Sequence, residues 1–133
     1  MIDVVFKFLK DEINTYLLTQ TGVNTVEVKP SQLVDDMGKY AFGEDQIAVS
    51  LVNIEEERIF KSQQQDYSYT NGQNVVVEPE LKLNLYIMFA ANFKQYDESL
   101  KFISHILTFF QARRTFTSEK YPALAPRVLK LCL

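Results

Sequence analysis

The segment from Glu80 to Arg114 changes its hydrophobic period partway along, and this change restricts the folds that the chain can adopt. Its first part has an apolar residue at every second position, which is the period of a β-strand. This alternating set is Leu81, Leu83, Leu85, Ile87 and Phe89. Its second part, from Leu100 to Phe110, has apolar residues every three to four positions, the period of an amphipathic helix. A strand that leads directly into such a helix predicts a core of sheet packed on helix.

The predicted helix has more apolar surface than one narrow stripe. Its main stripe is Leu100, Ile103, Leu107 and Phe110, and the residues that broaden it are Phe102, Ile106 and Phe109. Either the helix is sandwiched between the sheet and a second helix, or one edge of it is buried only when subunits meet. We expect the first arrangement for the main stripe and the second for Phe109. Asp97 is expected to be the N-cap, because its carboxylate can accept hydrogen bonds from the first turn.

The rest of the chain predicts one further helix and several strands. Apolar residues share one face of residues 2–18, and Lys7, Lys10, Asp11 and Asn14 point away from it, which predicts an amphipathic helix that ends near Gly22. Strands are predicted at Val23–Lys29, Gln46–Ile54, Val75–Val77 and Val128–Leu133, and a loop at Ser31–Asp45. The strand Gln46–Ile54 is apolar on both faces, so we expect an interior strand covered on both sides. The predicted class is α+β, with a mixed or antiparallel sheet of about four strands packed against two long helices.

Composition predicts a single globular domain over residues 1–133. Hydrophobic residues make up 47% of the chain and charged residues 23%, which is near the globular average. The formal net charge is −3, whereas a nucleic-acid-binding surface needs clustered Lys and Arg. No apolar run approaches the ~18 residues that a membrane-spanning helix needs. We therefore expect no nucleic-acid partner and no direct membrane insertion.

The termini and the cysteine content bear on the compartment. Charged residues between Asp3 and Glu12 interrupt any apolar signal-peptide core. The one cysteine, Cys132, excludes an internal disulfide and fits a reducing compartment. We expect the protein to be cytoplasmic when it is made.

Few residues offer catalytic chemistry. The one histidine, His105, lies within the predicted apolar helix and is either a general base or metal ligand, or a helix surface or boundary residue. A nucleophile would be needed beside it, and nothing in the spacing brings Cys132 there. Zinc bound by Cys and His is excluded by ligand number, and phosphate-binding glycine motifs are absent. We therefore expect neither a catalytic residue nor a cofactor or metal.

One acidic cluster is a candidate for chemistry or ion binding: Glu55, Glu56 and Glu57. Paired carboxylates can perform acid–base chemistry or bind divalent ions. On a strand, however, Glu55 and Glu57 point one way and Glu56 the other, so the set does not converge on a ligand. The cluster is either a charged strand end that discourages wrong edge pairing, or part of an intersubunit ion pair. Candidate partners for that ion pair are Arg58, Arg113 and Arg114; the last two also suit the C-terminal dipole of the central helix.

The polar segment Lys61–Gln73 is predicted to be an exposed loop or the tip of a hairpin, because it contains an Asn-Gly turn signal. It is either a variable solvent loop or an adaptable contact surface with alternating aromatic and hydroxyl residues. Its candidate contact residues are Gln63, Gln64, Tyr67 and Tyr69.

Three stretches together resemble a known bacterial family. They are MIDVVFKFLKDEINTYL at the start, IAVSLVNIEEER in the middle, and LKLNLYIMFAANFKQYDESLKFISHILTFFQA. In this order they are similar to the tail-terminator, or cap, proteins of phage-tail-like contractile injection systems of the virulence-cassette and anti-feeding-prophage types. The matching positions are Asn53, Glu55, Glu56, Glu57, Arg58, Asn84, Tyr86, Tyr96 and Leu100. Members of the family are expected to continue beyond the position of Leu133.

The resemblance implies a non-enzymatic α/β subunit of a hexameric ring. Such a ring caps the inner tube at the end far from the baseplate and contacts the last sheath ring, so the implied partners are further copies of the chain, the tube protein and the sheath protein. A second hypothesis places the subunit at the baseplate end of the same particle, as a tube initiator or sheath adaptor. A third, of another class, is a small enzyme or ligand-binding domain built around His105 and the acidic cluster.

Overall fold

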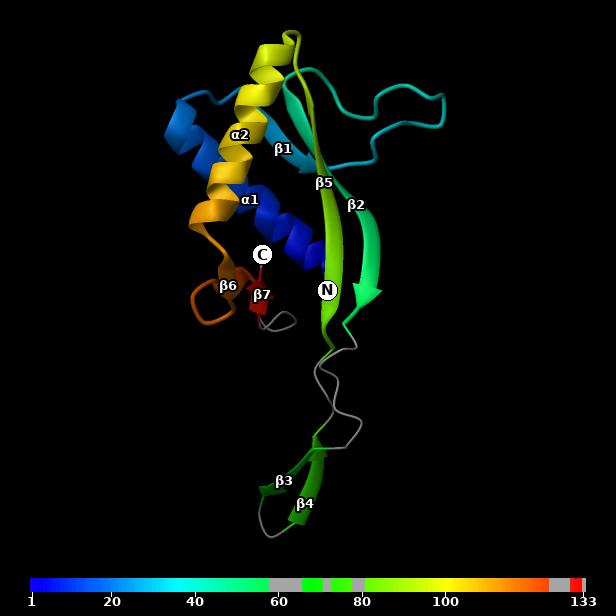
Figure 1. Ribbon diagram of the computed structural model, residues 1–133, viewed down its shortest axis with the longest axis vertical. Coiled ribbons are helices and arrows are strands. Elements are labelled where there is room, and N and C mark those ends of the chain that lie inside the picture. Colours follow the sequence, from blue (N-terminus) through cyan, green and yellow to red (C-terminus); the bar gives the residue numbers. More distant parts are fainter. Residues whose placement is uncertain (58–65, 71–72, 78–80, 125–129, 133) are drawn as a thin grey trace. The chain divides into compact units, whose positions relative to one another are not determined.

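The computed structural model describes residues 1–57, 66–70, 73–77, 81–124 and 130–132 (Figure 1). Contacts within the chain group it into two compact units. The first unit is Met1–Ser50 together with Met88–Leu133, and the second is Leu51–Ile87. Each unit is described by itself, and the single domain expected over residues 1–133 stays a prediction.

The main sheet has three strands in the order β1-β2-β5: β1 is Glu27–Pro30, β2 is Gln46–Glu56 and β5 is Leu83–Asn92. β1 and β2 are parallel, with Glu27 opposite Gln46. β5 is antiparallel to β2. Near one end the Asp45 N–H donates to the Asn92 carbonyl at 2.8 Å, and near the other the Glu57 N–H donates to the Lys82 carbonyl at 2.9 Å. The sheet is therefore mixed, with β2 in its interior as predicted, and with three strands where about four were expected.

The two predicted helices are present as α1 (Ile2–Thr21) and α2 (Tyr96–Ala112), and both lie on the same side of the sheet (Figure 1). The α+β class is therefore confirmed. α1 ends where expected, because Gly22 adopts a left-handed backbone with φ 69° and its N–H donates to the Leu18 carbonyl at 2.8 Å. The prediction of Asp97 as N-cap is wrong: Gln95 is the N-cap, and Asp97 already lies in the first helical turn. Its charge there still suits the positive end of the helix dipole.

β2 is covered on both sides only along its first half. Ile47, Ala48 and Val49 are all buried, so consecutive side chains, which point to opposite faces, meet packed atoms. Farther along, Val52 is 58% exposed and Ile54 is 43% exposed. The predicted two-sided burial is therefore confirmed for Ile47–Val49 and wrong for the far half of the strand.

A side chain of α1 closes the outer edge of β1. Asn14 donates its Nδ2 hydrogen to the Val28 carbonyl at 2.9 Å, and its Oδ1 accepts from the Val28 N–H at 2.8 Å. Val28 itself is fully buried. The sequence pattern placed Asn14 on the solvent side of the helix, and that placement is wrong. The amide instead substitutes for a neighbouring strand, which satisfies two buried backbone groups.

The core-facing side of α2 is not the stripe that periodicity predicted. Its buried residues are Ser99, Phe102, Ile106 and Phe109. Phe109 is 0% exposed and its ring lies 5.4 Å from Tyr16 of α1, so the predicted subunit-interface role of Phe109 is wrong. Leu100 and Leu107, expected in the core, are 49% and 60% exposed. Two apolar stripes adjoin on this helix, and contact with α1 selects the one that contains Phe109.

The small elements complete the description. β3 (Asp66–Thr70) and β4 (Gln73–Val77) form an antiparallel pair in which Thr70 lies opposite Gln73. The strand at Val75–Val77 is thus confirmed, and of the two alternatives for Lys61–Gln73 the pairing supports a hairpin rather than a loop over Asp66–Thr70, since Tyr and Thr favour extended backbone. β6 (Thr115–Thr117) pairs antiparallel with β7 (Lys130–Cys132), which confirms the predicted terminal strand over its described residues. A short 3₁₀ helix, η1, spans Pro122–Leu124.

Replacing Asn14 with Ala should lower the free energy of unfolding by about 1–3 kcal/mol, because the change leaves the buried backbone groups of Val28 without partners. Denaturant unfolding followed by circular dichroism measures this. Lys7→Ala, on the exposed face of the same helix, is the matched control and should stay within about 0.5 kcal/mol of the parent. Equal stability of the two variants would show that the Asn14–Val28 contact contributes nothing.

Phe109→Ala should destabilise the subunit by about 3–5 kcal/mol, since it leaves a cavity in a fully buried aromatic site. Leu107→Ala on the same helix should change stability by only about 0.5 kcal/mol, because the Leu107 side chain is largely exposed. Thermal unfolding of the two variants at low protein concentration tests the orientation of α2. A larger loss for Leu107→Ala would contradict it.

Candidate assembly interface

Five polar residues that carry part of the family resemblance come together within the unit Leu51–Ile87. They are Asn53, Glu55, Glu57, Asn84 and Tyr86. The Tyr86 hydroxyl donates to a Glu55 carboxylate oxygen at 3.2 Å. The Asn84 amide donates to a Glu57 carboxylate oxygen at 3.1 Å, and the Asn53 amide donates to Glu55 at 3.3 Å. We call these five residues the polar ladder.

Strand alternation explains the polar ladder. Side chains at every second position share one face of a strand, so Asn53, Glu55 and Glu57 project together from β2 and its end. The antiparallel partner β5 supplies Asn84 and Tyr86 to that same face, because their hydrogen bonds reach the two carboxylates. The prediction that Glu55 and Glu57 point the same way is confirmed. A carboxylate that accepts these hydrogen bonds is restricted in its movement.

The polar ladder also affects the acidity of Tyr86. The hydrogen bond to Glu55 raises the pKa of the Tyr86 phenol above its ordinary value of 10.0, and the negative charge of Glu55 adds to the shift. A phenolate beside two carboxylates would be repelled by them, so the neutral phenol, which can donate a hydrogen bond, is favoured. Tyr86 therefore serves as a donor over the whole physiological pH range.

The opposite face of the same two strands is apolar. Val52 and Ile54 alternate with the ladder residues of β2 and are 58% and 43% exposed. Leu83, Leu85 and Ile87 alternate with the ladder residues of β5 and are half-buried. This part of the sheet thus has one polar and one apolar face, which is typical of a strand pair that packs against a neighbour on one side.

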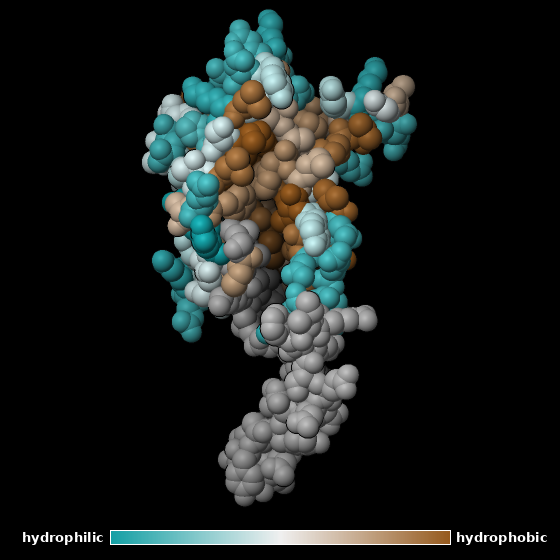
Figure 2. Space-filling model, viewed as in Figure 1, coloured by the Kyte–Doolittle hydropathy of each residue, from teal (hydrophilic) through white to brown (hydrophobic). Residues whose placement is uncertain are grey.

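The other compact unit exposes an apolar stripe on α2. Tyr96, Leu100 and Leu107 recur along one side of the helix and are 75%, 49% and 60% exposed. Beside them Phe110 packs edge-on against Phe89 of β5, with ring centroids 5.6 Å apart. Figure 2 shows the hydrophobic residues that gather on this face over α2 and the adjoining strand. A stripe of large apolar side chains left in water is typical of a surface that another subunit covers.

The two arginines after α2 have different surroundings. The guanidinium of Arg113 lies over the rings of Tyr16 and Phe109, at 5.2 Å and 4.9 Å from their centroids. It therefore covers the edge of the aromatic core through cation–π contacts. Arg114 is exposed, and within the described residues the structure records no ion pair for either arginine. An intersubunit ion pair with the glutamates stays a prediction, and its third candidate, Arg58, lies outside the described residues.

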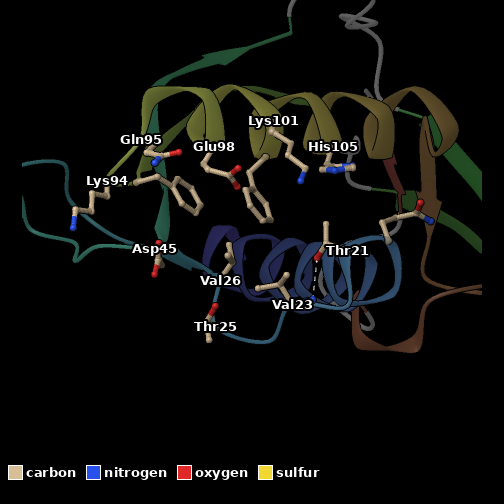
Figure 3. A pocket seen from close by; sticks show the side chains of 13 residues that line it. Thr21, Val23, Thr25, Val26, Asp45, Lys94, Gln95, Glu98, Lys101 and His105 are labelled. Carbon is tan, nitrogen blue, oxygen red and sulfur yellow. Dashed lines mark hydrogen bonds between the residues drawn. The ribbon is translucent and has the colours of Figure 1, made fainter.

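His105 is a half-buried residue at the edge of the α2 core stripe, with its ring 6.1 Å from that of Phe102. It borders a pocket of about 570 Å³ between the N-terminal half of α2 and the segment that follows α1. Glu98, Lys101 and His105 reach into it from α2, opposite Thr25 and Val26 (Figure 3). Its charged rim is of mixed sign, and no cluster of metal-ligating side chains was found among the described residues.

The candidate contact residues of the polar segment can be followed only in part. Tyr67 and Tyr69 lie in β3, opposite Val76 and Asn74 of β4. Gln63 and Gln64 lie outside the described residues. The contact role of all four residues stays a prediction.

A protein-family comparison matches residues 5–132 to the Pvc16 N-terminal domain. The chain belongs to this family. The Pvc16 N-terminal domain family is one of virulence-cassette components, so the chain is a component of a virulence-cassette injection system. No curated protein matches the sequence. None of the helices that the structure describes has the length and hydrophobicity of a membrane span.

Neutralising Glu55 should lower the pKa of Tyr86 towards its ordinary value of 10.0, because Glu55→Gln removes the negative charge beside the phenol. Titration of the tyrosine Cζ signals by carbon NMR measures this, with Tyr86→Phe to assign the resonance. Asp97→Asn, which removes a carboxylate on α2, is the matched control. Identical titration of Tyr86 in the two variants would show that the polar ladder is not formed in solution.

Proposed function

We propose that this member of the Pvc16 N-terminal domain family caps the inner tube of a contractile injection particle at the end distal to the baseplate. The observation that carries the proposal is the family match over residues 5–132, which makes the chain a cassette component. The resemblance of IAVSLVNIEEER and the Leu81–Ala112 segment to tail terminators supports the specific role. The cap is a homo-oligomeric ring, with the tube protein on one side and the last sheath ring beside it.

Capping requires little chemistry and much surface complementarity. A tube of stacked rings ends in an unpaired ring that recruits the next one, because each contact is heterologous and leaves a new copy of the same surface exposed. A cap binds that surface and presents a different one outward, so growth stops. The exposed apolar stripe of Tyr96, Leu100 and Leu107 and the polar ladder are two chemically different surfaces of this kind.

Particles assembled without this protein should have tubes of uncontrolled length or sheaths that detach, because nothing terminates stacking. Electron microscopy of purified particles measures the length distribution. Restoring the chain should restore uniform length, whereas Leu107→Glu should not, because it places a charge in the exposed apolar stripe. Thr108→Glu, one position along on the exposed surface of the same helix, is the matched control and should restore length.

A gold-labelled tag on the chain shows, in the same images, at which end of the particle the protein lies. Gold label at the end far from the baseplate fits the cap. Label at the baseplate would instead indicate a tube initiator or sheath adaptor, and unchanged particle length without the chain would overturn the capping role.

A further inference from the structure

The two outer edges of the main sheet differ sharply. The β1 edge is protected: the strand has only four residues, it includes Lys29 and Pro30, and the Asn14 amide bonds both backbone groups of Val28. Short length, lysine, proline and a covering group are the devices that prevent a sheet edge from pairing with another chain. Within the described residues, both backbone groups of Val28 on this edge are therefore already bonded.

The β5 edge has none of these devices. Its ten residues, LNLYIMFAAN, include no charged residue, no proline and no glycine. The Lys82 carbonyl accepts from the N–H of Glu57, directly after β2, so the backbone groups of Leu83, Leu85 and Ile87 point to the opposite, outer edge. In the described part of the chain no strand pairs with that edge. A long, uncharged edge of this kind invites an added strand.

The β3–β4 hairpin lacks a third strand among the described residues. Among the described residues it forms a two-stranded sheet by itself, and an isolated two-stranded hairpin is marginally stable in water. β4, QNVVV, is uncharged and has three consecutive valines, which favour extended backbone and sheet pairing. The edge of β4 that faces away from β3 is therefore suited to receive a third strand.

We propose that β4 of one copy adds to the outer edge of β5 in a neighbouring copy, so that copies join head to tail. Both halves of the contact belong to this chain, and neither carries a charge that would oppose their pairing. The hairpin gains the third strand that it lacks, and β5 gains a partner for its outward backbone groups. The contact is heterologous, so repetition around an axis closes a ring. This inference rests on the ring proposed above and identifies the surfaces that close it.

Disulfide trapping tests the contact directly. In a Cys132→Ser background, one chain carries Ile87→Cys on β5, and a second chain of different mass carries Val75→Cys or Val76→Cys on β4. The two β4 positions sample both faces of the strand. After mixing and mild oxidation, mass spectrometry should find the heterodimer as the main cross-linked product with one β4 position. Replacing the β5 cysteine by Thr108→Cys on α2 is the matched control and should abolish it.

A proline in β5 supplies a second test that preserves the subunit. Leu85→Pro removes an N–H that faces the outer edge, so it blocks strand addition and spares the hydrogen bonds to β2. We expect it to keep the circular dichroism of the parent and to lose both the ring and the cross-link.

The outcomes separate this contact from the capping role. Heterodimer no more abundant than in the Thr108→Cys control, in solution and in purified particles, would overturn the β4–β5 contact. If particles lacking the protein still lose length control, the cap stands and its ring closes elsewhere. If the cysteine variants cross-link strongly but particles made without the protein keep their normal length, the β4–β5 contact stands and the capping role is overturned.

Discussion

The aromatic cluster around Phe109 and Phe116 sets the arrangement of the helical unit. Both rings are 0% exposed, and their centroids lie 6.1 Å apart. Phe8 of α1 meets Phe116 at 5.2 Å, and Tyr16 meets Phe109 at 5.4 Å, so the cluster joins α1, α2 and β6. Burying each phenylalanine contributes about 1.5–3 kcal/mol. Because α2 must direct Phe109 inward, the Leu100 and Leu107 side of the helix is left facing water.

The aromatic cluster explains which parts of the fold could be predicted from the sequence and which could not. Hydrophobic period identified both helices, the interior strand and the alternation of β5, because each follows from local geometry. The hydrophobic period could not decide which of two adjoining apolar stripes on α2 is buried, since Leu100 and Phe109 are both large apolar residues on one helix. That choice depends on Tyr16 and Phe116, which lie far away in the sequence. Asn14 escaped prediction for the same reason, because its partner is a backbone that only the fold places nearby.

The polar ladder shows the converse case, in which sequence located the residues but not their arrangement. Strand alternation already placed Glu55 and Glu57 on one face and Glu56 on the other. It could not supply Asn84 and Tyr86 as donors, because the register of β5 on β2 brings them there. Single hydrogen bonds between exposed groups stabilise the fold only weakly. A row of them on a strand pair orders the carboxylates and adds little to the stability of the fold.

The unequal treatment of the two sheet edges has a physical consequence for assembly. An open edge exposes a chain to unwanted pairing, so its cost in misassembly must be outweighed by what it binds. Closing the β1 edge with Asn14 and Pro30 prevents β1 of one copy from pairing with β5 of the next, which would extend the sheets into an open-ended row. What remains among the described residues is the open β5 edge and the β3–β4 hairpin on each copy. Pairing of β4 with β5 of the next copy is a heterologous contact, so its repetition around an axis closes a ring, whereas pairing of two β5 edges would stop at a symmetric dimer.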